Sequence, residues 1–175
     1  MTTKKKKIKC KNKTLKKEKY YKAVCVFHKN PYNVTGVVEF SQRKNSKKVR
    51  VKYNIKNLKN GLHGFHIHNF GDLRDECHSA CAHFNPYNKN HGGRISKERH
   101  VGDLGNLLCK NNKCVGSFYD SYISLKPGHK CNIVGRSVII HEDEDDLGMG
   151  NNDESLKTGN AGKRLACGVV GLTNN

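Results

Sequence analysis

The sequence predicts an all-β fold, an antiparallel sandwich or barrel of eight strands with two long functional loops. Three observations lead to this prediction. Short segments alternate between apolar and polar residues, as half-buried strands do. Asn, Gly and Pro separate these segments, as at Asn30-Pro31, Asn57–Gly61 and Lys110–Lys113. No long segment has the 3.6-residue period of an amphipathic helix.

Each expected strand is a short run with two-residue alternation that ends at a turn signal. In chain order they are Tyr20–Phe27, Val34–Phe40, Val49–Ile55, Gly64–His68, Asp103–Leu108, Cys114–Tyr119, Arg136–His141 and Leu165–Val170. Two connections, Asn69–Val101 and Glu142–Arg164, are too long for hairpins, and long loops in a compact domain are usually functional. The first carries histidines, and the second carries an acidic, glycine-rich run that ends at Arg164.

Composition places the chain among globular proteins with one domain. It has 175 residues, 35% of them hydrophobic, and no apolar run approaches the roughly 20 residues that a membrane helix needs. The Lys-rich N-terminus lacks the apolar region of a secretory signal, so we expect a cytoplasmic location, with a nuclear one as the alternative. In such a reducing compartment most of the eight cysteines should be free.

Positive charge is concentrated at the N-terminus. Residues 1–22 hold eleven Lys and one Glu, which accounts for +10 of the formal net charge of +18. We interpret residues 1–19 as a basic, disordered, solvated tail and residues 20–175 as the folded domain. The alternative is an arm for nuclear import or for contact with nucleic acid or another polyanion.

The histidines are spaced like the ligands of a metal site. His66 and His68 lie two apart on an expected strand, so their side chains point to the same face. Three imidazoles and one carboxylate follow in order, which is enough for a closed tetrahedral zinc site. These four residues are His83, His91, His100 and Asp103. His141, beyond a later strand, is a further candidate.

The motifs around these residues resemble copper/zinc superoxide dismutase over nearly the whole chain, from about Tyr20 to about Leu172. They are GLHGFHIHNFGD at 61–72, HFNP at 83–86, HGG at 91–93, ERHVGDLGN at 98–106 and GNAGKRLACG at 159–168. The resemblance implies a Greek-key β-barrel with a zinc loop and an electrostatic loop. It also implies one copper and one zinc per subunit and the conversion of superoxide to oxygen and hydrogen peroxide.

The resemblance also implies the ligands. Copper is expected on His66, His68, His83 and His141, and zinc on His83, His91, His100 and Asp103. His83 would then bridge both metals and take part in catalysis as a proton carrier, and no ligand position is replaced. Imidazoles suit both oxidation states of copper.

Further residues match the family in supporting roles. Asp145 matches an aspartate that links His66 to His91, which would fix the orientation of both ligands. Arg164 matches the channel arginine that binds the anionic substrate, because a guanidinium hydrogen-bonds and orients an anion. Lys157 matches a steering lysine, and Thr158 matches a residue that narrows the channel. His63 matches a hydrogen-bonding residue under the strand.

One position departs from the family. Asp143 stands where many relatives have a second steering lysine, and Lys163 beside Arg164 is expected to offset it. The remaining histidines, His28, His78 and His129, are expected at the surface.

The cysteines fall into several kinds. The resemblance pairs Cys77 with Cys167 in a disulfide that ties the zinc loop to the last strand. Cys25 is expected to pack in an alternating strand, and Cys81, four residues from Cys77, is left open as a competitor for pairing. Two more, Cys109 and Cys114, flank a turn, and whether they bond is left open.

An active superoxide dismutase is the leading interpretation, and three others were weighed. A copper-chaperone-like protein is disfavoured because no N-terminal Met-x-Cys-x-x-Cys motif is present. A metal-binding decoy is disfavoured because no ligand and no channel arginine is lost. A function of the tail on nucleic acid or another polyanion is compatible with enzyme activity.

The expected partners are superoxide, a second copy of the chain, and a polyanion at the tail, with no membrane. The resemblance implies an isologous homodimer interface, for which small and apolar residues are suited. It would lie near Phe70, Gly71, Ile133, Gly135 and Val169–Leu172.

Overall fold

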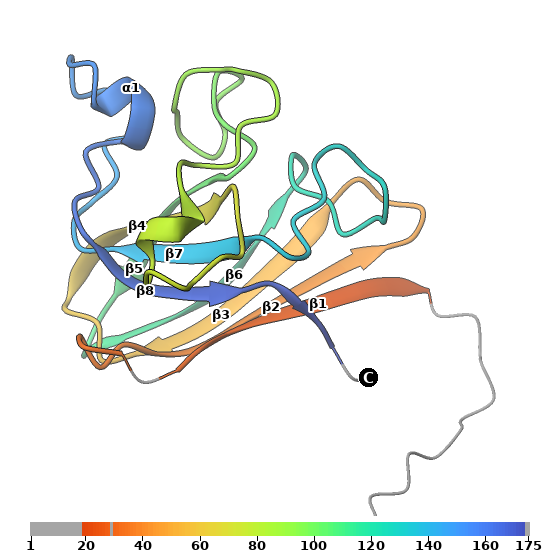
Figure 1. Ribbon diagram of the computed structural model, residues 1–175, viewed down its shortest axis with the longest axis horizontal. Coiled ribbons are helices and arrows are strands. Elements are labelled where there is room, and N and C mark those ends of the chain that lie inside the picture. The colour runs from red at the N-terminus through yellow and green to blue at the C-terminus, as the bar shows by residue number, and fades with distance from the viewer. Residues whose placement is uncertain (1–18, 29, 174–175) are drawn as a thin grey trace, which may run out of the picture.

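The computed structural model describes residues 19–28 and 30–173 and contains two antiparallel sheets packed face to face (Figure 1). The five-stranded sheet has the order β6-β3-β2-β1-β9, and the four-stranded sheet has the order β5-β4-β7-β8. The strands are β1 (Tyr20–Phe27), β2 (Thr35–Arg43), β3 (Val49–Lys56), β4 (Gly61–His68), β5 (Asp103–Cys109), β6 (Lys113–Asp120), β7 (Ser137–His141), β8 (Arg164–Val169) and β9 (Gly171–Leu172). The prediction of an antiparallel all-β fold is confirmed. The predictions for residues 1–18 lie outside the described residues.

The arrangement is a sandwich rather than a closed barrel. The edge strands β5 and β6 belong to different sheets, and the turn between them carries one bridge, in which Lys110 and Lys113 exchange backbone hydrogen bonds of 2.8 and 3.0 Å. Helix is confined, in the described part of the chain, to a 3-10 turn at His78–Ala80 and to α1 (Ser155–Thr158). No helix of this part is long and apolar enough to cross a membrane.

Two details of the topology differ from the prediction. The last expected strand, Leu165–Val170, corresponds to β8, and a ninth strand that was not expected, β9, follows it. The backbone of Val170 bonds to Gly135 and Arg136, and β9 then pairs with β1 in the other sheet. The connection from β6 to β7, residues 121–136, is a third long loop, which the expected strands leave open but which was not counted among the long connections. It is held by the buried Gln42, whose Oε1 accepts from the N–H of Leu125 at 2.7 Å.

The core lies between the sheets and is built from alternate residues of the strands. Phe40 and Ile55 face inward from the five-stranded sheet, and Phe65 and Ile140 face inward from the other. Cys25 is fully buried among them, as predicted, and burial raises the pKa of its thiol to about 12. This packing gives β4 and β7, which carry three of the candidate ligands, a rigid base.

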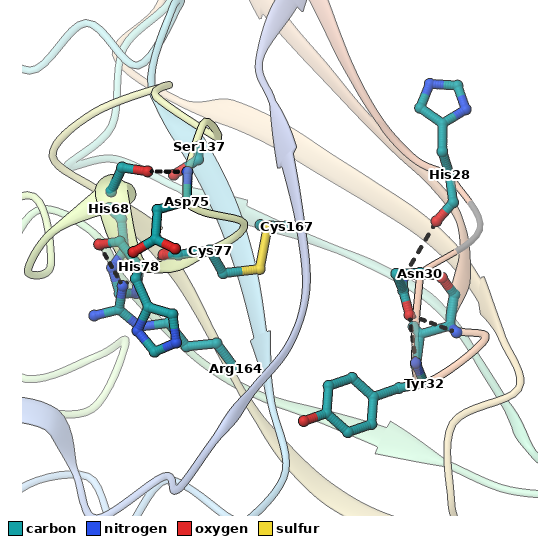
Figure 2. Close-up of a disulfide and its surroundings, with 12 residues drawn as sticks. His28, Asn30, Tyr32, His68, Asp75, Cys77, His78, Ser137, Arg164 and Cys167 are labelled. Carbon is teal, nitrogen blue, oxygen red and sulfur yellow. Dashed lines mark hydrogen bonds between the residues drawn. A yellow bond between two sulfur atoms is a disulfide. The ribbon is translucent and has the colours of Figure 1, made fainter.

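Two disulfides connect elements of the fold. Cys77–Cys167 ties the loop of residues 69–101 to β8, as predicted, and Figure 2 shows it beside Arg164. Cys109–Cys114 joins β5 to β6 just outside the Lys110–Lys113 pair. Its Cα atoms are 4.2 Å apart, close to the spacing of a non-hydrogen-bonded antiparallel pair, and it therefore links the two sheets at one edge. Cys81 is a free, exposed thiol.

Candidate metal centre

Four buried imidazoles converge at one end of the four-stranded sheet. We call His66, His68, His83 and His141 the four-histidine group; one ring nitrogen from each lies within 4.8 Å of the others. His66 and His68 come from β4, and His141 comes from the end of the neighbouring strand β7. His83 reaches the group from the long loop and is bridged to His68 by backbone pairing. The ring centroids of His66 and His83 are 4.0 Å apart.

The far nitrogens of these rings fix their orientation. His68 Nδ1 donates to the carbonyl of Cys81 at 2.7 Å, and His141 Nδ1 donates to the carbonyl of Gly162 at 3.1 Å. His66 Nε2 is 2.8 Å from Asp145 Oδ2. Since each of these nitrogens holds its proton against an acceptor, the opposite nitrogen carries a lone pair toward the centre.

A second group shares His83. We call His83, His91, His100 and Asp103 the His–Asp group, and all four residues are buried. The Nδ1 atoms of the three histidines lie 2.9, 3.1 and 3.1 Å from a single oxygen, Asp103 Oδ1. Ligands that sit ~2.0–2.1 Å from a tetrahedral zinc are about 3.3 Å apart, so this spacing suits one zinc ion. His83 presents Nδ1 to this group and Nε2 to the four-histidine group.

Asp145 connects the two groups, as the sequence predicted. Its Oδ2 bonds to His66 Nε2 and its Oδ1 bonds to His91 Nε2, both at 2.8 Å. Asn106 holds this carboxylate in place through two 2.8 Å bonds to the backbone of Asp145, a role that sequence reasoning missed. The signal was available, because Asn106 ends the ERHVGDLGN motif at 98–106.

The donor set fits metals, because five of its inward nitrogens make no hydrogen bond. The buried side-chain nitrogens and oxygens of the described residues that make no hydrogen bond are five imidazole nitrogens: His66 Nδ1, His68 Nε2, His83 Nε2, His91 Nδ1 and His141 Nε2. An unpartnered buried polar atom is costly. All five point into one of the two groups, and imidazole nitrogens are good ligands for copper and zinc.

Electrostatics differ between the groups. Burial lowers the pKa of His66 to about 4 and that of His83 and His141 to about 3, and neighbouring imidazoles add to this effect. These rings are therefore neutral at pH 7, as metal ligands must be. For His91, burial also lowers the pKa, but the nearby carboxylates of Asp103 and Asp145 outweigh it and raise the pKa to about 9. Hydrogen bonds from imidazoles hold the pKa of Asp103 far below its usual value in spite of its burial.

An open cavity of ≈ 660 Å³ leads to the four-histidine group. His68, His83 and His141 form its floor, and Arg164 lines its wall. Arg164, which lies beside Cys77 in Figure 2, donates from Nη1 to the carbonyl of Cys77 at 2.7 Å. Its Nη2 donates to the carbonyl of Cys81 at 2.8 Å. Two parts of the long loop thus hold the guanidinium beside the imidazoles, and N–H groups remain available for an anion.

The short helix α1 lies at the rim of this cavity. It places Lys157 and Thr158 on the lining, where sequence analysis expected them. Glu154, which was not expected, also lines the cavity, and its Oε1 accepts from Thr158 Oγ1 at 2.7 Å. Asp143 and Lys163 are not among its lining residues, and the carboxylate of Asp143 packs against Gly162. The departure at Asp143 therefore lies outside the cavity wall.

Other residues were missed or sit as expected. Arg99 is fully buried, bonds to Asp120 Oδ2 at 2.9 Å and donates to the carbonyl of His100 at 3.0 Å, so it positions that ligand. The ring nitrogens of His63 lie 3.0 Å from the carbonyls of His141 and Lys59, which agrees with the supporting role expected of it. The histidines expected at the surface are all exposed: His28, His78 and His129.

The sandwich and its paired donor groups define a protein built for two adjacent metal ions, one of them open to solvent through a cationic cavity. Comparison with known proteins agrees with this description. The family model for copper/zinc superoxide dismutase (SODC) matches residues 34–170.

Similar curated proteins come from distant sources. A superoxide dismutase [Cu-Zn] of Paramecium bursaria Chlorella virus 1 is 58% identical over 140 residues, which cover 79% of this chain and 73% of the relative. Superoxide dismutase [Cu-Zn] A of Xenopus laevis is 53% identical over 151 residues, 86% of this chain and 97% of the relative. The superoxide dismutase [Cu-Zn] of Saccharomyces cerevisiae is 51% identical over 148 residues, which cover 83% of this chain and 95% of the relative. The chain belongs to the copper/zinc superoxide dismutase family, whose activity converts superoxide to oxygen and hydrogen peroxide.

Proposed function

We propose that the four-histidine group holds copper, that the His–Asp group holds zinc, and that His83 bridges them in a working superoxide dismutase. The observation that carries this proposal is the set of five unpartnered imidazole nitrogens, which divide between the two groups. His83 offers one nitrogen to each group. When bound, copper supplies the change of oxidation state by which one superoxide is oxidised to oxygen and a second is reduced.

The side chains of the cavity perform the other steps. Lys157 at the rim attracts the anion, and Arg164 hydrogen-bonds and orients it next to the imidazoles. Thr158 and its partner Glu154 narrow the entrance. His83 lines the cavity and its Nε2 faces the four-histidine group, so a proton held at this atom can pass to the reduced product. Two superoxide ions and two protons give one oxygen and one hydrogen peroxide.

Substitution of Arg164 tests this proposal. Arg164→Ala should leave copper and zinc contents unchanged and should lower catalytic efficiency roughly tenfold or more, since one charge-assisted contact is worth ~1.5–3 kcal/mol. Arg164→Lys keeps the positive charge but not the planar guanidinium with its several N–H donors, so it should recover part of the lost catalytic efficiency. Metal analysis and a superoxide assay of the metal-loaded protein measure both effects.

The matched control is Arg74→Ala, which removes an exposed arginine that pairs with Asp72 and does not line the cavity. It should keep full activity. Equal activity of Arg164→Ala and Arg74→Ala would show that Arg164 does not act on the substrate. Activity of the loaded wild-type protein no higher than that of buffer would overturn the proposed function.

We also propose that the protein is a homodimer. Phe70, Val169 and Leu172 are exposed apolar side chains, and Leu172 is 77% exposed. Gly71 and Gly135 lie in close contact beside them, which leaves a flat surface. Ile133 and Val170 are fully buried in the subunit, so their side chains take no part.

Light scattering at micromolar concentration should give the mass of a dimer. Phe70→Glu should shift the protein toward the monomer, because a charge at a buried apolar contact is left unpaired. Ile95→Glu changes an equally apolar residue that is 91% exposed elsewhere and should leave the dimer intact. A monomer mass for the wild-type protein contradicts the proposal.

Two further proposals concern residues 1–19 and the compartment. The Lys-rich segment is proposed to be a solvated tail attached to the domain of residues 20–175, able to contact polyanions, and the protein is proposed to be cytoplasmic with access to the nucleus. The composition of the segment supports them. A curated relative from Brugia pahangi, 45% identical, is named extracellular, so localisation of a tagged full-length protein is the direct test.

A further inference from the structure

The excess of positive over negative charge in the chain is concentrated in its first third. Residues 1–18 hold nine Lys and one Glu, and residues 19–56 hold ten Lys and Arg and a single acid, Glu39. Residues 57–175, which contain every candidate ligand, hold fourteen Lys and Arg and thirteen acids. The excess charge of the folded domain therefore belongs to β1, β2, β3 and their connections.

These strands direct their charges to one surface. In β3 the buried residues Val49, Val51 and Ile55 alternate with exposed side chains, among them Arg50, Lys52 and Lys56. Cross-strand pairing places Lys22 of β1, Ser41 of β2 and Arg50 of β3 in one row across the sheet. Glu39 is neutralised by Lys52, with Nζ 3.0 Å from Oε2.

We call this surface the basic face. It consists of exposed cations on the three strands and on the turn between β2 and β3, where residues 43–52 contain six cations and no acid. Its members are Lys22, Arg43, Lys44, Lys47, Lys48, Arg50, Lys52 and Lys56. An open depression of ≈ 610 Å³ runs across it, lined in part by Lys22, Arg50 and Lys52.

Two of the neighbouring aromatic rings are covered by cations, and a third, Tyr119 opposite Arg50, is 61% exposed. The guanidinium of Arg43 lies 5.8 Å from the ring centroid of Tyr20, and Nζ of Lys44 lies 5.4 Å from that of Tyr21. Single-stranded nucleic acids are usually bound by free aromatic rings on which bases stack. A broad row of cations with only one open ring beside it, Tyr119, instead matches the regular phosphates of a duplex.

The basic face lies on the opposite side of the sandwich from the metal centre. In Figure 1, β1, β2 and β3 form the lower layer, whereas α1 and the loop of residues 69–101 rise above the four-stranded sheet. Among the described residues, none lines both the depression on the basic face and the cavity at the metal centre. A polyanion on the basic face therefore leaves the substrate cavity open.

We propose that the basic face binds the phosphate backbone of double-stranded DNA, without reading its sequence, and holds the enzyme there in an active form. Cations on one strand face two residues apart are spaced by roughly 6.8 Å, so several phosphates can be contacted at once. The binding does not depend on the proposed enzymatic activity.

The test uses the full-length, metal-loaded protein and a labelled 20-base-pair duplex of arbitrary sequence, with affinity measured from 50 to 200 mM salt. The double variant Lys22→Gln/Arg50→Gln removes two cations from one row of the basic face. The control Lys59→Gln/Lys97→Gln removes two exposed cations outside it, so both variants have the same net charge. All four side chains are exposed, so folding should be kept, and circular dichroism verifies this.

The face variant should reduce the slope of log affinity against log salt by about 2 and should weaken binding at every salt concentration, because each lost phosphate contact contributes ~0.9 to the slope. The control variant should match the wild-type slope. Equal behaviour of the two variants would overturn the proposal. Binding to anionic lipid vesicles or single strands that is tighter than binding to the duplex would also overturn it.

A second arm measures superoxide dismutation at saturating duplex. Activity should stay within about twofold of that of the free enzyme, since charges farther apart than the ~8 Å Debye length are largely screened. Loss of most of the activity on DNA binding would place the DNA at the cavity and would contradict binding at the basic face. Because the DNA titration reads fluorescence and not turnover, an inactive enzyme would not affect its outcome.

Discussion

The two donor groups share His83 but are held in place by different kinds of partner. In the four-histidine group, His68 and His141 bond to backbone carbonyls, and their positions follow from strands and loops already fixed by the core. In the His–Asp group, three imidazoles gather around the carboxylate of Asp103, and His91 lies between two carboxylates. The first group is therefore organised by the fold and the second by charge.

This difference implies different behaviour without metal. The fold keeps the rings of the four-histidine group neutral, so their lone pairs are ready for a metal at pH 7. The His–Asp group instead concentrates negative charge and satisfies it with a proton on His91. A metal ion entering this group must displace that proton.

The largest expected effect is that of pH on the metal-free protein, in which the groups should respond in opposite directions. The pKa values of His66, His83 and His141 are lowered to about 4, 3 and 3, so between these values and pH 6.5 the unfolded chain binds more protons. Stability should therefore fall as pH drops from 6.5 toward 4. Conversely, the raised pKa of His91, about 9, gives stability that is complete below pH 6.5 and lost as pH rises through 9.

Melting temperatures in chelator from pH 4 to pH 10 measure both limbs. His91→Gln should abolish the loss on the alkaline side and retain the loss on the acidic side. The depressed pKa of Asp145 acts in a separate window, because its contribution is lost only as pH falls below 3.8. A melting temperature that does not change between pH 6.5 and pH 4 would contradict the neutral state of the buried imidazoles.

The next effect tests the connection between the groups, at Gly159. This residue follows α1 with φ +69°, and a Cβ there would lie 2.5 Å from His91 Nε2 and still closer to Asp145 Oδ1. Gly159→Ala should therefore displace Asp145 and lower the affinity for zinc roughly 10–100-fold. The unfolding free energy should fall by about 3 kcal/mol, from backbone strain together with a lost charged hydrogen bond.

Gly128→Ala is the matched control. Gly128 has a similar φ of +73°, but nothing lies within 4 Å of the added Cβ. Gly128→Ala should lower the unfolding free energy by about 1–2 kcal/mol, from backbone strain alone, and should leave the affinity for zinc unchanged. If the two variants behave alike in a metal titration, the bridge through Asp145 is not what aligns the groups.

The sequence predicted much of this arrangement, and the reasons are local. Alternation located the strands, and the spacing of His66 and His68 placed two imidazoles on one face before any contact was known. The motifs assigned Asp145 to the link between His66 and His91, and the structure brings these three side chains together. Each of these features depends on a short segment of the sequence and can therefore be recognised from that segment.

What could not be predicted depends on contacts between distant segments. The expected strands already leave residues 120–135 as a connection, but the contact that holds this loop comes from Gln42 on another strand and could not be predicted. The disulfide Cys109–Cys114 depends on the register of the hairpin, which spacing alone leaves open. The carbonyl of Cys81, which orients both His68 and Arg164, is a backbone atom without any sequence signature.

The smallest expected effect concerns Cys81, the backbone acceptor of the four-histidine group. This residue has φ 64° and ψ −146°, in a region that essentially only glycine occupies without strain. The strain persists because its carbonyl accepts from His68 Nδ1 at 2.7 Å and from Arg164 Nη2 at 2.8 Å, so relaxation would break both bonds.

Cys81→Gly should raise the unfolding free energy by about 1 kcal/mol, since the strain of ~1–3 kcal/mol is relieved and the more flexible unfolded chain offsets part of the gain. Denaturant unfolding of the metal-free protein in reductant-free buffer measures this gain. Cys81→Ala removes the thiol but keeps the Cβ, so the unfolding free energy of this variant should not rise. A rise in the unfolding free energy of both variants would assign the effect to loss of the thiol. A rise in stability for Cys81→Gly but not for Cys81→Ala would show that the four-histidine group depends on a strained backbone conformation at Cys81.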